Sequence, residues 1–291
     1  MASENSSSLP AIPPTSPPLN AQLHAKLVSA IRKADPSLLK ASRILSAPSS
    51  LDLNLMTAQY ALTFISESIK IVHNKAEVTK LLFKLSLLSK YFDSIALVSK
   101  EGILVPPSQT ALRLRRLAAL ISDVRIFNRL WGLLTMFKWG SSVIQAPPKD
   151  LLLKLIAYTQ VVSNTIYQPL ENIAYLGSHD ILPVSKWTIG KLWLFSSRLW
   201  ALHIVLEFVR LAREKQISRR SAKIPTEKES VEAAAERAEA DKLWSRQLIV
   251  TSAYFPLTVH WSLESGVLND WLVGLFGTIA GGVRFIPLWR E

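Results

Sequence analysis

Residues 247–290 decide the fold class of this chain, and they read QLIVTSAYFPLTVHWSLESGVLNDWLVGLFGTIAGGVRFIPLWR. The stretch contains two uncharged segments, 247–263 and 271–283, separated by a short polar turn. An apolar helix of about 17–25 residues is long enough to cross a bilayer. The two segments therefore predict a membrane anchor, built either as one transmembrane helix or as a helical hairpin. The alternative is a helix pair buried in a soluble core.

The composition of the whole chain also favours a membrane protein. The chain is 49% hydrophobic, contains nine Trp and carries a formal net charge of +12. A soluble protein this basic would suggest nucleic acid as a partner. A chain that is also this apolar and Trp-rich fits an anionic membrane better, with Lys and Arg at the headgroups and Trp at the interface. We therefore expect membrane lipids, and no nucleic acid, as partners.

Apolar residues recur at helical spacing along nearly the whole chain, whereas the alternation typical of half-buried strands is scarce. The expected fold class is therefore all-α, a helical membrane-associated bundle with a C-terminal transmembrane helix or hairpin. Changes in composition divide the chain into four predicted segments. They are a disordered Pro/Ser-rich tail at 1–20, a helical membrane-associated domain at 21–215, a polar charged linker at 216–246 and the membrane anchor at 247–291.

A capping signal predicts where one of the helices begins. Ser108 is expected to cap a helix that runs to about Trp139, and a further helix is expected to run from Lys149 or Asp150 to about Leu176. The first of these helices carries Arg115, Arg125 and Arg129 opposite an apolar stripe. The stripe consists of Leu117, Leu120, Ile121, Val124, Phe127, Trp131 and Leu134. Such a helix either lies in a membrane interface or packs into an ordinary helical core.

Three further sets of residues are candidates for function in a membrane. The segment 53–72 has an apolar face that is predicted to insert into the membrane interface. Small residues in 271–283 are spaced so that two transmembrane helices can approach closely, which predicts helix–helix association and self-association. Trp side chains at both ends of the anchor are predicted to sit at the interface. The inserting face is Leu53, Met56, Tyr60, Phe64 and Ile71; the association residues are Gly274, Gly277, Gly281 and Gly282; the interfacial anchors are Trp261, Trp271 and Trp289.

Motifs for catalysis find little support in this sequence. His203 and Glu207 lie one helical turn apart, a spacing that suits a metal, but no third ligand accompanies them. The glycines follow neither the phosphate-loop nor the dinucleotide-binding pattern. The chain contains no cysteine, which excludes thiolate chemistry. We therefore expect a protein that is not an enzyme and that has no catalytic residues, cofactor or metal.

Three blocks of the sequence resemble one known family. They are IYQPLENIAYL at 166–176, the Trp- and Phe-rich segment 191–215 that ends in RLAREK, and GTIAG at 277–281 followed by PLWR at 287–290. In order and spacing, over roughly residues 50–291, the chain is similar to the peroxisomal biogenesis factor 11 proteins, especially their fungal C-type branch. The resemblance implies a peroxisomal membrane protein that elongates the organelle before fission. It also implies self-association, and a dynamin-related GTPase and its adaptor as partners.

The expected function is therefore elongation, proliferation and fission of peroxisomes by amphipathic-helix insertion and oligomerisation, without catalysis. The protein should be integral to the peroxisomal membrane. Its termini and the basic segment 210–246, with ten Lys and Arg, should lie in the cytosol. The alternative is a channel or carrier for small metabolites. That alternative ranks lower because the sequence shows no paired ionisable residues inside clear spans. A soluble helical scaffold with a basic surface is the third possibility.

Overall fold

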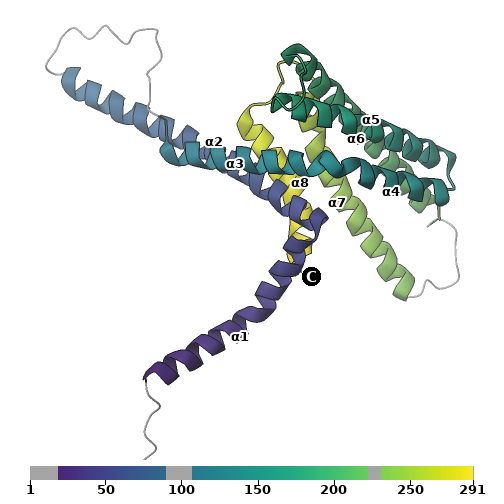
Figure 1. Ribbon diagram of the computed structural model, residues 1–291, viewed down its shortest axis with the longest axis horizontal. Coiled ribbons are helices and arrows are strands. Elements are labelled where there is room, and N and C mark those ends of the chain that lie inside the picture. Colours follow the sequence, from purple (N-terminus) through teal and green to yellow (C-terminus); the bar gives the residue numbers. More distant parts are fainter. Residues whose placement is uncertain (1–18, 90–106, 222–230, 291) are drawn as a thin grey trace, which may run out of the picture. The chain divides into compact units, whose positions relative to one another are not determined.

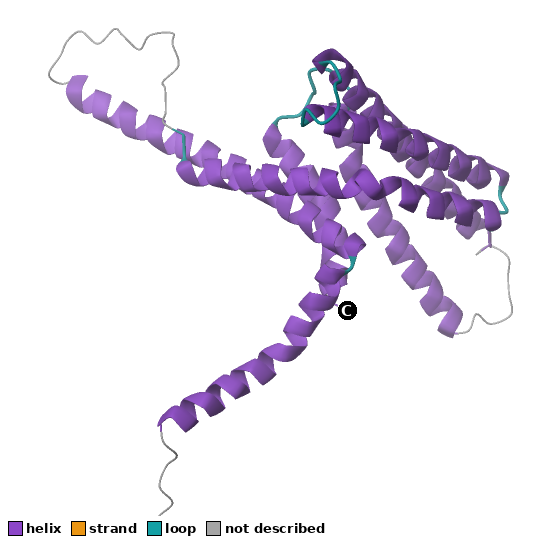
Figure 2. Cartoon of the chain, viewed as in Figure 1, coloured by secondary structure: helices purple, strands orange, loops and turns teal. Residues whose placement is uncertain are grey.

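Helices form the secondary structure throughout the residues that the structure, a computed structural model, describes: 19–89, 107–221 and 231–290 (Figure 2). Those residues contain no strand, so the expected all-α class is confirmed. The chain divides into two compact units, 1–48 and 49–291. The first unit contains helix α1 (Leu19–Ser46), and the second contains all the helices discussed below. Most of the tail predicted at 1–20 lies outside the described residues.

The region predicted as one helix from Ser108 to Trp139 consists of α3 (Gln109–Asn128), a single 3₁₀ turn η1 (Arg129–Trp131) and α4 (Gly132–Gln145). Ser108 caps α3 as predicted, and its hydroxyl accepts a hydrogen bond from the Ala111 N–H. Figure 1 shows α3 and α4 running on as almost one rod.

Helix α5 (Leu151–Ser178) explains the 3₁₀ turn that separates α3 from α4. Gln168 donates a hydrogen bond to the carbonyl of Arg129, and Asn172 donates one to the carbonyl of Leu130, at 2.8 and 3.1 Å. Gln168 also fills the space in which a side chain at Gly132 would stand. Carbonyls that bond to a neighbouring helix favour a locally tighter turn, because they are not restricted to the α-helical pattern.

Helices α5 and α6 (Lys186–Ser221) form an antiparallel pair that is fixed at both ends. At one end Asp150 caps α5 by accepting from the Leu153 N–H, and it forms an ion pair with Arg213 at 2.7 Å. The hydrogen bonds from Arg213 hold the pKa of the Asp150 carboxyl below its ordinary value. At the other end the Trp193 indole donates to the Ser178 hydroxyl at 3.3 Å.

Helices α7 (Val231–Trp261) and α8 (Asp270–Arg290) form a C-terminal hairpin, one of the two arrangements that the sequence left open. Gly266 adopts a φ of +64°, and the backbone N–H groups of Val267 and Leu268 both donate to the His260 ring at 2.9 Å. A left-handed conformation this close to the imidazole favours glycine, which has no Cβ. The turn therefore holds the two apolar segments against each other.

Helix α6 runs antiparallel to α7, which defines two ends of the bundle. At the end where α6 stops and α7 starts, Lys215 pairs with Asp241 at 2.7 Å. We call this the basic end, because Arg219 and Arg220 also lie there. At the opposite end Lys191 pairs with Glu264 at 3.0 Å and lowers the pKa of that carboxyl. The C-terminus of α8 returns towards the basic end, since α8 reverses the direction of α7.

Helix α8 also lies antiparallel along α2 (Pro48–Ser89), and two hydrogen bonds fix their register. The Trp271 indole donates to the Ser68 hydroxyl, and the Trp289 indole donates to the Asn54 side-chain oxygen, each at 3.0 Å. By length and composition, α8 and residues 186–220 of α6 are the two described helices that could cross a membrane.

Candidate membrane-facing surface and polar interior

The rod formed by α3, η1 and α4 carries large apolar side chains on its outside. Trp131, Leu134 and Phe137 are 69%, 72% and 78% exposed. All residues of the stripe predicted in this region are exposed except Ile121, which is half-buried. In water such a surface would forgo the free energy that folding gains when apolar side chains are buried. We call it the α3–α4 apolar surface; it consists of Leu117, Leu120, Val124, Phe127, Trp131, Leu133, Leu134, Phe137 and Ile144.

The opposite side of the same rod turns charged residues towards the other helices. Arg125 is only 8% exposed, and its guanidinium forms an ion pair with Asp52 of α2 at 2.9 Å. The same guanidinium donates to the side-chain oxygen of Gln59 at 2.6 Å. The predicted opposition of stripe and arginines is therefore present, and it is the arginine side that faces the bundle.

A second ion pair links η1 to α5. Arg129 lies 2.9 Å from Glu171, whose side chain is 6% exposed. The Tyr167 hydroxyl donates to the same carboxylate at 2.6 Å. One oxygen of Glu171 and the Nε of Arg129 are buried without a hydrogen-bond partner. Buried polar atoms nearly always have a hydrogen-bond partner in proteins, so these two atoms are exceptions within the cluster.

A third cluster connects α5, α6 and α7 around Glu207. Its carboxylate accepts hydrogen bonds from Arg210, from Gln160 at 3.3 Å and from Gln247 at 3.1 Å. The His203 ring lies 3.0 Å from the Asn164 amide. His203 and Glu207, singled out by their spacing, therefore belong to a hydrogen-bond network.

These three clusters share one cavity of about 750 Å³. Its polar lining includes three arginines and three carboxylates, and aromatic side chains form much of the remaining wall. The residues that carry these groups are Asp52, Tyr60, Arg125, Arg129, Tyr167, Glu171, Trp193, Trp200, Glu207, Tyr254, Trp261 and Arg284. The bundle thus combines paired ionisable groups in its interior with large apolar side chains on its outside, whereas charged residues in soluble proteins are almost never fully buried unless they are paired.

The face of α2 that is predicted to insert into a membrane is partly covered in this structure. Met56 and Tyr60 are buried, and the Tyr254 hydroxyl of α7 contacts the Met56 sulfur at 2.9 Å. The Phe64 ring lies 5.0 Å from the Trp271 ring of α8. Leu53 is half-buried, and Ile71 at the end of the stripe is exposed. Insertion of this whole face would require α2 to separate from α7 and α8.

The glycines predicted to associate with another helix lie against α2 of the same chain. A Cβ at Gly274 would come within 2.5 Å of the Phe64 backbone nitrogen, and one at Gly281 within 2.6 Å of the Thr57 hydroxyl. A Cβ at Gly277 would overlap the Tyr60 ring. Gly282 has open space beside it. Three of the four glycines therefore form one seam, and Gly282 lies outside it.

The three predicted interfacial tryptophans all have partners inside the bundle. Trp261 stacks on Trp200 of α6 with 5.6 Å between ring centroids. Trp271 and Trp289 make the hydrogen bonds to α2 described above. Each of the three is half-buried, so each keeps part of its ring available to a membrane.

Comparison with known proteins is consistent with the resemblance noted in the sequence. Residues 84–289 match the family of peroxisomal biogenesis factor 11. The chain is 28% identical to peroxisomal membrane protein 11C of Mus musculus over 184 residues, which are 60% of this chain and 74% of that protein. It is also 28% identical to an uncharacterized protein of Schizosaccharomyces pombe over 173 residues, 58% of this chain and 73% of that protein. No solved structure matches.

The family match covers more than half of the chain and includes the rod of α3 and α4, the α5–α6 pair and the C-terminal hairpin. The family is defined by its role in peroxisome biogenesis and is not a known family of enzymes. Membership therefore supports a role at the peroxisomal membrane in peroxisome proliferation. The chain belongs to the peroxisomal biogenesis factor 11 family.

Proposed function

We propose that this protein is an integral protein of the peroxisomal membrane that elongates the organelle before fission, and that the α3–α4 apolar surface contacts lipid while it does so. The observation that carries the proposal is the distribution of polarity on the rod formed by α3, η1 and α4. Phe137 is 78% exposed on the rod whose Arg125 is 8% exposed. Hydrocarbon accommodates apolar side chains on the outside of a bundle and requires charged ones to pair inside it.

The proposed mechanism is expansion of one leaflet by an apolar surface seated in the interface. The α3–α4 apolar surface is available for this in the structure as it stands. The predicted face of α2 would join it if α2 left the seam with α8. Self-association would then concentrate these surfaces in one region of membrane, and a dynamin-related GTPase with its adaptor would complete fission. The basic end should face the cytosol with α8's C-terminus, because cytoplasmic flanks are enriched in Lys and Arg.

A dye at position 137 should report lipid contact directly. The chain has no cysteine, so Phe137→Cys provides a single labelling position in the full protein. In vesicles, brominated acyl chains should quench a dye on this cysteine strongly. A dye on Ala235→Cys, in the charged and exposed part of α7, should be quenched several-fold less. Equal quenching at the two positions would contradict a lipid-facing α3–α4 surface.

The same surface should be needed for elongation in cells. Phe137→Glu places a carboxylate in the proposed lipid contact, where insertion scales give a cost of roughly 3 kcal/mol at full depth. We expect shorter peroxisomes with Phe137→Glu than with Gln145→Glu, which adds the same charge to an exposed polar position at the end of α4. Normal elongation by Phe137→Glu, with the protein at its usual abundance, would remove this surface from the mechanism.

The second candidate function is passage of small polar molecules through the bundle. The ion pairs Arg125–Asp52 and Arg129–Glu171 favour it, because all four side chains line the cavity and pathways through membrane proteins are marked by paired ionisable groups. Vesicles that contain the full protein should release a trapped organic anion faster than vesicles that contain the same anion but no protein. Ser197→Phe, in the cavity wall, should slow release at least several-fold, whereas Ser142→Phe, on exposed α4, should not. A release rate equal to that of the protein-free vesicles would reject transport.

A further inference from the structure

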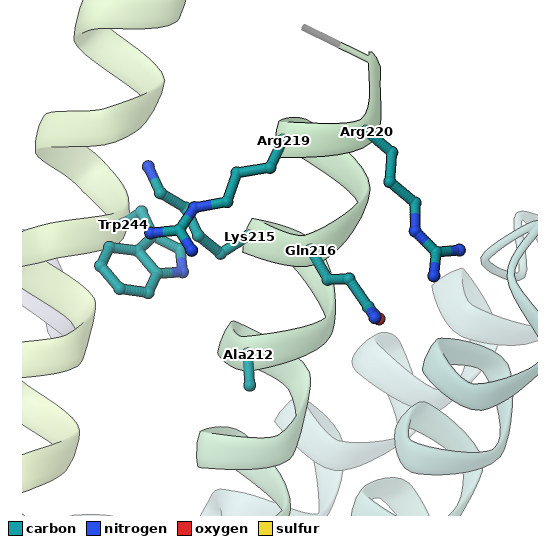
Figure 3. A pocket seen from close by; sticks show the side chains of 6 residues that line it. All are labelled: Ala212, Lys215, Gln216, Arg219, Arg220 and Trp244. Carbon is teal, nitrogen blue, oxygen red and sulfur yellow. The ribbon is translucent and has the colours of Figure 1, made fainter. Parts of the chain in front are cut away.

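A second hollow, of about 490 Å³, lies at the basic end between α6 and α7, away from the polar interior. It is lined by Ala212, Lys215, Gln216, Arg219, Arg220 and Trp244 (Figure 3). Figure 3 shows the Arg219 side chain extending towards Trp244 and Lys215, while Gln216 and Arg220 extend from the other side of α6. We call this hollow the basic pocket.

The aromatic wall of the basic pocket is held in place. The Trp244 indole donates a hydrogen bond to the carbonyl of Leu211 at 2.9 Å, which fixes the ring against α6. The Lys215 amine lies 5.1 Å from the centroid of that ring and pairs with Asp241 at 2.7 Å. A site whose walls are already ordered loses less conformational entropy when a ligand enters.

The charge of the basic pocket suits a dianion. Lys215, Arg219 and Arg220 supply three positive charges, and Asp241 pairs with Lys215. Arg219 and Arg220 are both exposed. The resulting charge of +2 matches a phosphomonoester, which carries about −1.5 to −2 at neutral pH. Guanidinium groups also bind phosphate oxygens in a bidentate manner.

The position of the pocket favours a lipid over a free phosphate. Lys215 is six residues beyond Val209, an exposed apolar residue of α6, which corresponds to about 9 Å along a helix. Leu243, next to Trp244, is 56% exposed, so apolar surface adjoins the pocket on α7 as well. Basic residues beside Trp at the end of an apolar helix are typical of the headgroup level of a membrane.

We propose that the basic pocket binds the phosphomonoester headgroup of an anionic phospholipid in the leaflet at the basic end, with Lys215 and Arg219 on the phosphate and Trp244 as the wall. Acyl chains would then lie along Leu243 and the exposed valines of α6. This inference rests on the proposed function, in which the protein is integral to a membrane. It adds a defined lipid position on the helical bundle, separate from the α3–α4 apolar surface.

The test is native mass spectrometry of the full protein in detergent micelles with phosphatidic acid, phosphatidylserine or phosphatidylcholine. Phosphatidic acid should bind most tightly. Arg219→Gln/Arg220→Gln should weaken its binding at least about tenfold. The matched control is Lys242→Gln/Arg246→Gln, which removes the same charge from exposed positions of α7 near the same end. Phosphatidic acid binding to the control should change less than about twofold.

Other outcomes would overturn the proposal. If the two double variants weaken phosphatidic acid binding equally, the lipid is attracted by the general positive charge at this end and not by a defined site. Inorganic phosphate that displaces phosphatidic acid at similar concentration would indicate a site for free phosphate. An unchanged lipid affinity, together with loss of a crosslink to an acidic protein, would assign the pocket to a protein partner. Failure of membrane insertion is distinguished separately, since carbonate would then extract the unmodified protein from membranes.

Discussion

Gly277→Ala should destabilise the bundle by about 2–3 kcal/mol relative to Gly282→Ala. Both substitutions replace glycine by the best helix former in the same helix, which alone favours folding by up to about 1 kcal/mol. The difference arises because a Cβ at Gly277 would overlap the buried Tyr60 ring, whereas a Cβ at Gly282 meets no atom within 4 Å. Overpacking of this kind typically costs about 1–3 kcal/mol. The measurement is denaturant titration in detergent micelles.

Separation of α2 from α8 should accompany the loss of stability caused by Gly277→Ala. Cysteines placed at Asn54 and Trp289, whose side chains are hydrogen-bonded at 3.0 Å, report the distance between the helices by crosslinking. The crosslink yield should fall with Gly277→Ala and stay unchanged with Gly282→Ala. If the effect of Gly277→Ala instead disappears on dilution of the protein, the glycines associate between chains and the seam with α2 is not their main contact.

Arg125→Met should cost about 3 kcal/mol, the lower end of the range for removing one partner of a buried ion pair. The substitution leaves Asp52 and Gln59 without their shared donor inside the bundle. The lower end applies because the Asp52 side chain is 43% exposed and still reaches solvent. Arg116→Met is the matched control on the same helix, since Arg116 is exposed, and it should change stability by less than about 0.5 kcal/mol. Equal effects of the two substitutions would show that Arg125 faces outward.

Local signals in the sequence predicted much of the fold. The sequence predicts Ser108 as a cap because a cap depends on residues within one turn of it. The turn around Gly266 was recognised by its polar composition between two uncharged segments. The 3₁₀ turn at Arg129–Trp131 could not be predicted in this way, since it depends on Gln168 and Asn172, which are about 40 residues away in the chain.

The ion pairs that line the cavity could not be predicted from the residue pattern of a single helix. The opposition between the apolar stripe and Arg125 was visible in the sequence, but the pattern does not say which side faces the bundle. In water the stripe would pack inward; in lipid it faces outward, and the arginines need partners. Those partners, Asp52 and Glu171, lie 73 and 42 residues from Arg125 and Arg129 in the chain. The glycine spacing likewise predicted a close helix contact without identifying α2 as the partner.

The continuity of α7 gives it a mechanical property. The helix starts at Val231 in a charged segment and continues without interruption into the apolar hairpin. From Val231 to Pro256, the first residue that lacks a backbone N–H, it spans about 37 Å at 1.5 Å per residue. A hydrogen-bonded rod of that length behaves as a lever. A force applied to the charged part of α7, before Gln247, would therefore tilt the hairpin as well. A partner that binds this part of α7 would change the orientation of the hairpin.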